Sequence, residues 1–191
     1  MLKPVFKLCL PLGCFVLSAS LATAQEVVHA LAGTVSAVNP AAKTMTVDNS
    51  DGDGGLFSVA TGKNAKIEID KDLRADTTPA SEFSKKGDEV VVFFVVSGFG
   101  PRTAIAVEDL GAGKLESDSG KVVGFDRRQH LLKIETKAGG SESFQIGDKT
   151  AVETSMGAVD GRRYDPEKGD EVQIICSSSN GTKDALFVGQ N

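Results

Sequence analysis

The sequence predicts an all-β chain made of two tandem, small, five-stranded β-barrels. The first observation is a repeated stretch, because Lys86–Phe93 (KGDEVVVF) returns as Lys168–Ile175 (KGDEVQII). Each copy is a polar turn with a glycine, which adopts positive φ at little cost, followed by an apolar, β-branched strand. The second observation is that placing Gly33 on Gly120 aligns most of the two halves at a constant offset. Both observations indicate internal duplication.

Within each copy, apolar and polar residues alternate with a period of two rather than 3.6, over short runs bounded by turn residues. Such runs are typical of antiparallel strands joined by tight turns. Thr78-Pro79 and Asp165-Pro166 can each begin a short helical turn. About five strands per copy suit a small closed or partly open barrel, and a single larger β-sandwich is the structural alternative. Besides the repeated stretch, the expected strands are Gly33–Asn39, Thr44–Asp48, Phe57–Val59 and Thr103–Val107, then Gly120–Asp126, Leu131–Glu135, Phe144–Ile146 and Ala185–Val188.

The first stretch of the chain, residues 1–24, is predicted to be a Sec-type signal peptide. A basic start precedes the apolar run Leu8–Leu21, and the small residues Ala22–Ala24 predict cleavage before Gln25. The apolar run is too short, and too broken by Pro11, for a membrane span. We therefore expect a periplasmic or secreted protein whose mature chain has no transmembrane span.

The duplication also predicts the domain boundaries. The first barrel is expected over residues 25–110 and the second over residues 119–191. The glycine-rich segment 111–118 is expected to be the linker.

The repeated motifs resemble a family. Gly-x-Val-x-x-Val-Asn/Asp, a strand that ends Thr-Val-Asp or Lys-Ile-Glu, and Gly-Asp-x-Val before a closing strand resemble small exported bacterial OB-like barrel domains of unknown function. The resemblance covers nearly all of the mature chain, once per copy, and implies OB-like barrels. The layout is also similar to the periplasmic copper-chaperone barrel, whose metal site uses Met, His and Trp. This chain has no Trp and no clustered Met and His, so that site is not carried over.

Composition excludes several functions. Twenty-six acidic residues face 21 basic ones, and the excess grows when Lys3 and Lys7 leave with the signal peptide. An acidic surface repels phosphate backbones, so we expect no nucleic-acid partner. Cys176 is the only cysteine of the mature chain, which precludes an intramolecular disulfide, and its strand position predicts a buried, inert thiol. Two histidines in turn-like or terminal settings provide no convincing catalytic base, so we expect no enzyme and no cofactor.

Asp51 and Asp53 are weak candidates for a metal site. The segment Asn49–Gly54 imitates the front of a calcium loop, with oxygen ligands at alternate positions. Ala60, however, occupies the position where such a loop needs its bidentate Glu. The plainer interpretation is an acidic, glycine-rich hairpin loop.

Four arginines distinguish the second copy from the first. Arg127 and Arg128 lie in its first hairpin, and Arg162 and Arg163 lie in a later loop. Loops at one end of a barrel can converge on a groove, so these side chains could form an anion-binding patch. The alternative is two solvated basic turns.

One predicted strand of the first copy is apolar on both faces. Its outer residues Val91, Phe93 and Val95 match Gln173, Ile175 and Ser177 in the second copy. A strand that is apolar on both faces needs cover on both. We expect the other repeat, a second subunit or a partner to cover this face, with the turn around Phe83 or the loop at Phe99 as alternatives.

The sequence therefore favours a non-catalytic, exported binding or interaction module of the bacterial cell envelope, which would act through an envelope protein partner or through self-association. The alternative function is a periplasmic carrier of a metal ion or a small anion. An enzyme ranks third.

Overall fold

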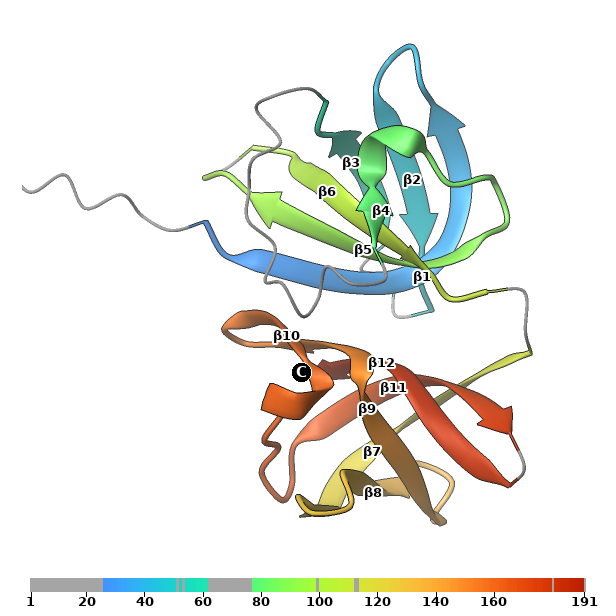
Figure 1. Cartoon of the computed structure of the whole chain (residues 1–191), viewed down its shortest axis with the longest axis vertical. Coiled ribbons are helices and arrows are strands. Elements are labelled where there is room, and N and C mark those ends of the chain that lie inside the picture. Colours follow the sequence, from blue (N-terminus) through green and yellow to red (C-terminus); the bar gives the residue numbers. More distant parts are fainter. Residues whose placement is uncertain are drawn as a thin grey trace, which may run out of the picture.

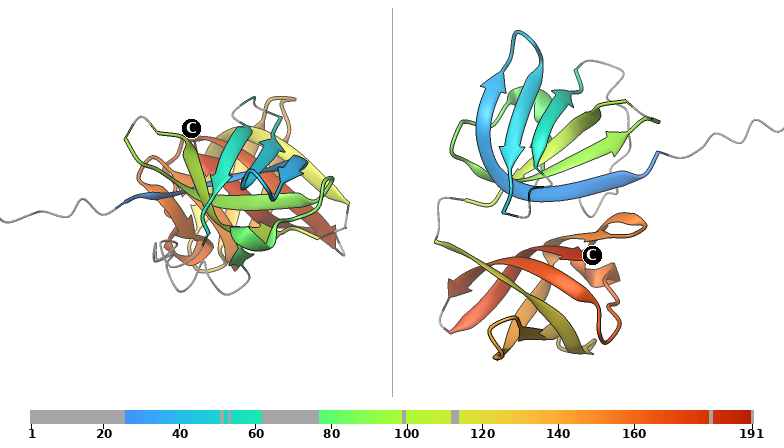
Figure 2. Two further views of the ribbon diagram at one scale, coloured as in Figure 1. Left: turned by 90° about the horizontal axis from the view of Figure 1, so that it is seen from above. Right: turned by 180° about the vertical axis from the view of Figure 1, so that it is seen from behind.

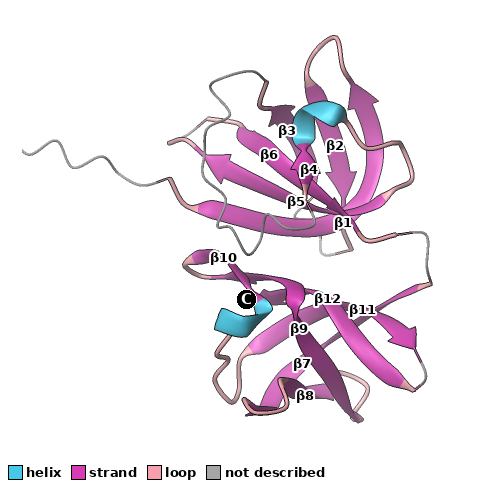
Figure 3. Ribbon diagram, viewed as in Figure 1, coloured by secondary structure: helices cyan, strands magenta, loops and turns pink. Residues whose placement is uncertain are grey.

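The computed structural model describes residues 26–50, 52, 54–61, 77–98, 100–111, 114–179 and 181–190. These residues form two six-stranded sheets, one from each half of the chain (Figures 1 and 3). The first sheet holds β1 (Val28–Asn39), β2 (Thr44–Asp48), β3 (Gly55–Val59), β4 (Thr78–Pro79), β5 (Glu89–Val96) and β6 (Arg102–Asp109). The second holds β7 (Leu115–Asp126), β8 (Leu131–Thr136), β9 (Ser141–Thr154), β10 (Gly157–Asp160), β11 (Glu171–Ser179) and β12 (Thr182–Gln190).

Five strands of each sheet close into a ring. In the first sheet the order is β3-β2-β1-β5-β6, and a parallel pairing of β3 with β6 completes the ring. The second sheet repeats this order as β9-β8-β7-β11-β12, with β9 and β12 parallel. The short strands β4 and β10 pair at the sides of these rings. The prediction of two tandem five-stranded OB-like barrels is confirmed. Among the described residues, no helix is long and apolar enough to span a membrane.

The details differ from the sequence-based expectations at several boundaries. The 3-10 turns η2 (Ala80–Glu82) and η3 (Gly161–Arg163) are the only helical elements described, and Asp160, rather than Asp165, caps the second. The strand β7 begins at Leu115, inside the range 111–118 that was expected to be a linker. Residues 115–118 pair with β11, so they belong to the second barrel. The predicted signal peptide lies outside the described residues.

Each barrel has its own apolar core, and the two cores are built from equivalent residues. Val35, Met45, Phe57 and Val92 of the first core correspond to Val122, Leu132, Phe144 and Ile174 of the second.

The two glycines that align the repeats, Gly33 and Gly120, are required for the same steric reason. A Cβ at either position would collide with the carbonyl oxygen of the neighbouring strand, from Asp48 or Glu135. The close approach of β1 to β2, and of β7 to β8, therefore requires glycine.

A third apolar cluster joins the two barrels. Val91, Phe93 and Val95 of β5 are buried in it, although they point away from the core of their own barrel. The second barrel contributes Ala151 and Phe187, and Figures 1 and 2 show β1 and β5 facing its β9, β10 and β12. From the sequence, several segments could cover this face, and in the structure the other repeat covers it. These three side chains do not form an exposed surface for a partner. The remaining buried members are Ala30, Ala32, Ile105 and Ala106.

Polar contacts fix the same junction. The Glu153 carboxylate of β9 lies 2.7 Å from Nδ1 of His29 and accepts a hydrogen bond of 2.7 Å from the backbone N–H of Ala30. Burial raises the pKa of this carboxyl, and its contacts with His29 and Ala30 only partly offset that effect. The β9–β10 hairpin fits closely against the start of β1, because a Cβ at Gly157 would lie 2.5 Å from Cγ1 of Val27.

We expect Phe93→Ala to lower the free energy of unfolding by about 3–5 kcal/mol, because it opens a cavity in a fully buried cluster. Urea denaturation of the purified mature chain measures this change. Leu56→Ala, at a site that is 62% exposed, is the matched control and should change stability by less than about 0.5 kcal/mol. Equal effects of the two substitutions would show that the junction is absent in solution.

We expect Glu153→Gln to change the pH dependence of stability. A carboxyl whose pKa is raised in the folded state contributes stability while it is protonated, and that contribution is lost as the pH rises through the folded pKa. The stability of the wild type should therefore fall relative to Glu153→Gln from about pH 4 upward. Urea denaturation of both proteins across this range, with the exposed Glu135→Gln as control, measures the difference. A difference that is independent of pH would contradict the prediction.

Candidate metal centre

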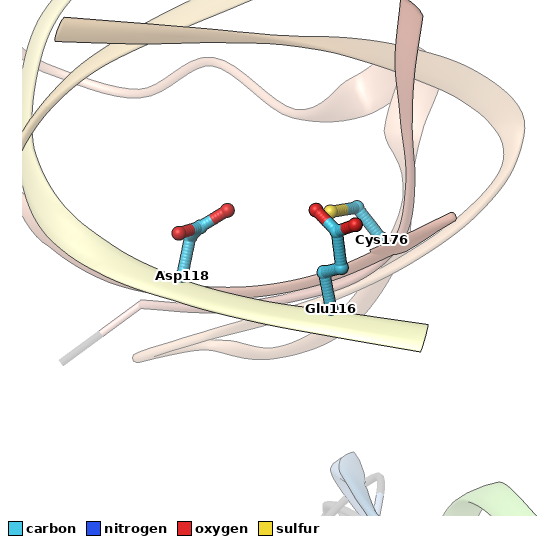
Figure 4. Close-up of side chains that lie close together, drawn as sticks. All are labelled: Glu116, Asp118 and Cys176. Carbon is cyan, nitrogen blue, oxygen red and sulfur yellow. The ribbon is translucent and has the colours of Figure 1, made fainter. Parts of the chain in front are cut away.

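The first half of β7 places two partly exposed carboxylates at one end of the second barrel. Glu116 pairs with Cys176 of β11, and Asp118 pairs with Ile174 two residues before it. Residues two apart on a strand share a face, so both carboxylates lie on the side of the buried Cys176 and Ile174. One ligand atom from each of Glu116, Asp118 and Cys176 lies within 4.8 Å of the other two, and Figure 4 shows the three side chains gathered above β7 and β11.

A lysine ammonium also lies in this cluster. Nζ of Lys183, on β12, is 2.8 Å from Oδ2 of Asp118 and 3.6 Å from Oε2 of Glu116, and it donates a further hydrogen bond to Glu142 of β9. Hydrogen bonds to Asp118 and Glu142 raise the pKa of Lys183 above its usual value. The three carboxylates therefore share one cation, and the cluster retains an excess of negative charge.

The Cys176 thiol is the apolar boundary of the cluster. It is fully buried and makes no hydrogen bond with any residue that the structure describes. Burial raises its pKa to about 11, with Lys183 opposing the shift and the nearby carboxylates adding to it. The thiol is therefore protonated and unreactive at neutral pH unless a metal ion replaces its proton.

The first barrel lacks this chemistry at the equivalent place. Its corresponding cation, Arg102, lies 5.8 Å from the ring centroid of Phe57, as Lys183 lies 5.4 Å from that of Phe144. A cation over this phenylalanine is thus common to both barrels. The surroundings differ, since His29, Leu31 and Phe94 of the first barrel stand where the second has Glu116, Asp118 and Cys176. Acids and a thiol therefore distinguish the second barrel.

The set of donors suits a divalent ion of intermediate softness. Zn(II) accepts thiolate sulfur at about 2.3 Å and carboxylate oxygen at about 2.0–2.2 Å, so two of its ligand atoms lie up to roughly 4 Å apart. The atoms in the cluster lie within 4.8 Å of one another. A contraction of about an ångström would bring them to one ion.

The four predicted anion-binding arginines do not form one patch, because Arg127 and Arg128 line a groove that Arg162 and Arg163 do not line. Arg127 forms a bidentate pair with Asp165, at 2.9 Å through Nε and 2.7 Å through Nη2. Arg162 and Arg163 both contact the buried Asp160, at 3.3 and 2.7 Å. Burial alone would raise the pKa of Asp160, but hydrogen bonds from these two arginines hold it below its usual value.

The other predicted candidates lie elsewhere or outside the described residues. Arg128 is exposed in the β7–β8 hairpin. The structure does not describe Asp51 and Asp53. Sequence reasoning missed Glu116, Asp118, Glu142 and Lys183. One feature of the sequence could have revealed the cluster. In the repeat alignment, Glu116 occupies the position of His29, and it lies next to Cys176, which was predicted to point inward.

Comparison with known proteins adds little. No family model matches the chain, and no curated protein matches it. Among solved structures, the chain is similar to "Crystal structure of Ag(I)CusF", with 15% sequence identity and a TM-score of 0.32 over 41% of this chain and 99% of that one. This likeness is too distant to support any argument about binding.

We expect Lys183→Met to lower the free energy of unfolding by roughly 2 kcal/mol at pH 7, because it leaves three carboxylates without their shared cation. The raised pKa of Lys183 means that its contribution is fully present at neutral pH. Chemical denaturation measures the change, with Lys137→Met in an exposed turn as control. A loss no larger than that of the control would contradict the assignment of Lys183 as the cation of the cluster.

Proposed function

We propose that the chain is an exported, non-catalytic binding protein whose second barrel carries a divalent metal ion of intermediate softness, such as Zn(II). The observation that supports this proposal is the clustering of the Cys176 thiol with two carboxylates at one end of that barrel, where a third carboxylate and an ammonium lie beside them. The first barrel, with the same fold and the same kind of cation, has none of these ligands at the equivalent positions.

Binding would exchange one cation for another. The ion would take the oxygens of Glu116 and Asp118, and the ammonium of Lys183 would move away from them. The S–H bond of Cys176 would break as the bond from sulfur to the metal forms, and the proton would leave to solvent. A site whose counter-ion belongs to the protein can load and unload without unfolding, which suits a carrier.

The surroundings of the cluster support a role without catalysis. Cys176 is buried, and no histidine among the described residues belongs to its cluster. His29 is held by Glu153 at the junction, and His130 lies in the β7–β8 hairpin. The proposal of a periplasmic or secreted location rests on the signal-like sequence of residues 1–24.

Titration of the metal-free mature chain with Zn(II), and with Co(II) as a spectroscopic substitute, tests the proposal. We expect one equivalent to bind, with release of a proton and a sulfur-to-cobalt absorption band. Asp118→Asn and Cys176→Ala should each weaken binding by more than about tenfold, which is the effect that even outer-shell changes produce. Lys183→Met should strengthen binding by removing the competing ammonium.

Glu135→Gln, an exposed acid on β8, should leave the affinity unchanged and serves as the control. Circular dichroism of each variant verifies that it is folded, and Asp118→Asn serves if Cys176→Ala is not. Failure of the wild type to bind either ion at micromolar concentration would overturn the proposal. Binding that is indifferent to both Asp118 and Cys176 would do the same.

A further inference from the structure

A separate groove lies at the other end of β7. It has a volume of about 790 Å³ and runs between the β7–β8 hairpin and the segment 165–168. Four basic residues line this basic groove, namely Arg127, Arg128, Lys133 and Lys168. The metal-centre carboxylates Glu116 and Asp118 lie near the opposite end of the same strand. The two features are therefore independent of each other.

Two acids also line the basic groove, and both are already engaged. Asp165 forms the bidentate pair with Arg127. Oδ1 of Asp126 accepts the backbone N–H groups of Arg128 and Gln129, at 2.9 and 3.0 Å, and so caps the hairpin turn. Three basic side chains remain, and within the described part of the chain they form no ion pair. These are Arg128, Lys133 and Lys168, and all three are exposed.

The floor of the basic groove is apolar. Val122, Phe125, Leu131 and Pro166 line it beside the basic residues. The Phe125 ring lies 6.1 Å from that of the buried Tyr164, centroid to centroid, which holds it in place. An apolar floor with a few charged groups at its rim is the usual composition of a small-molecule site.

The fold itself does not require this composition. In the repeat alignment, Arg127, Arg128 and Lys133 correspond to Pro40, Ala41 and Thr46 of the first barrel. The first barrel closes the same hairpin and the same ring of strands without these charges. Of the basic residues without an ion pair, Arg128 and Lys133 are therefore particular to the second barrel, whereas Lys168 has its counterpart in Lys86. In a chain whose net charge is −5, basic residues added around one groove favour an anionic ligand.

We propose that the basic groove binds a small organic anion that has an apolar body. Arg128, Lys133 and Lys168 hold its acidic group, and Phe125 and Leu131 contact its apolar part. Charge complementarity selects the anion, and the apolar floor distinguishes it from inorganic phosphate. This inference does not depend on the proposed metal site.

Fluorescence titration with 8-anilinonaphthalene-1-sulfonate tests the proposal in the mature chain, with neutral N-phenyl-1-naphthylamine as the uncharged probe. The double variant Arg128→Gln/Lys168→Gln should bind the sulfonate about tenfold more weakly, as expected for the loss of two exposed charge contacts. Its binding of the neutral probe should change much less. Amide chemical shifts of Phe125 and Leu131 should move on addition of the sulfonate.

The matched control is Lys86→Gln/Lys137→Gln, which removes the same charge. Lys86 occupies the repeat position of Lys168, and Lys137 lies in an exposed turn outside the basic groove. Equal weakening by both double variants would overturn the proposal, as would sulfonate binding that the first variant leaves intact, or no binding at all. Displacement of the sulfonate by an equal concentration of inorganic phosphate would overturn the part assigned to the apolar floor.

Discussion

The burial of β5 on both faces is the constraint on which the two-barrel structure depends. Val90, Val92 and Phe94 fill the first barrel, while Val91, Phe93 and Val95 are covered by the second. A strand that is apolar on both sides would expose a continuous hydrophobic surface if its barrel stood alone. The equivalent strand β11 is more polar on its outer face, where Gln173 and Ser177 flank the partly buried Ile175. The second barrel covers this strand, and its own Ala151 and Phe187 are buried in the same contact.

This asymmetry also separates the roles of the two copies. In the first barrel, His29 is committed to Glu153 at the junction, and Arg102 lies over the rings of Phe57 and Phe94. In the second, the same end of the barrel holds carboxylates and a thiol, and the opposite hairpin carries basic side chains. Both copies thus contribute to the junction, and the second alone carries these acids, the thiol and the added basic side chains.

The sequence predicts the fold because period-two alternation and a repeated turn depend on local residues alone. The predicted start of β7 lies too far along the chain. The first inward residues of this strand, Glu116 and Asp118, are acidic, and acidic residues in a glycine-rich segment are typical of a linker. Lys183 is not predicted to belong to the cluster, because a lysine in a strand normally faces solvent. The ion pairs of Arg127, Arg162 and Arg163 could not be predicted, because their partners, Asp160 and Asp165, are placed by turn geometry that the sequence pattern does not record. The sequence predicts that Val91, Phe93 and Val95 must be covered. Which segment covers them depends on tertiary packing and could not be predicted.

The ammonium of Lys183 has a consequence for the metal-free form of the proposed site. Many small metal-binding domains stay unfolded until they are loaded, because the free energy of metal binding is what stabilises their fold. Here the chain supplies its own cation, held by Glu116, Asp118 and Glu142. The charge of the cluster is therefore partly neutralised without any metal ion, so that folding of the second barrel does not have to wait for the ion that we propose it binds.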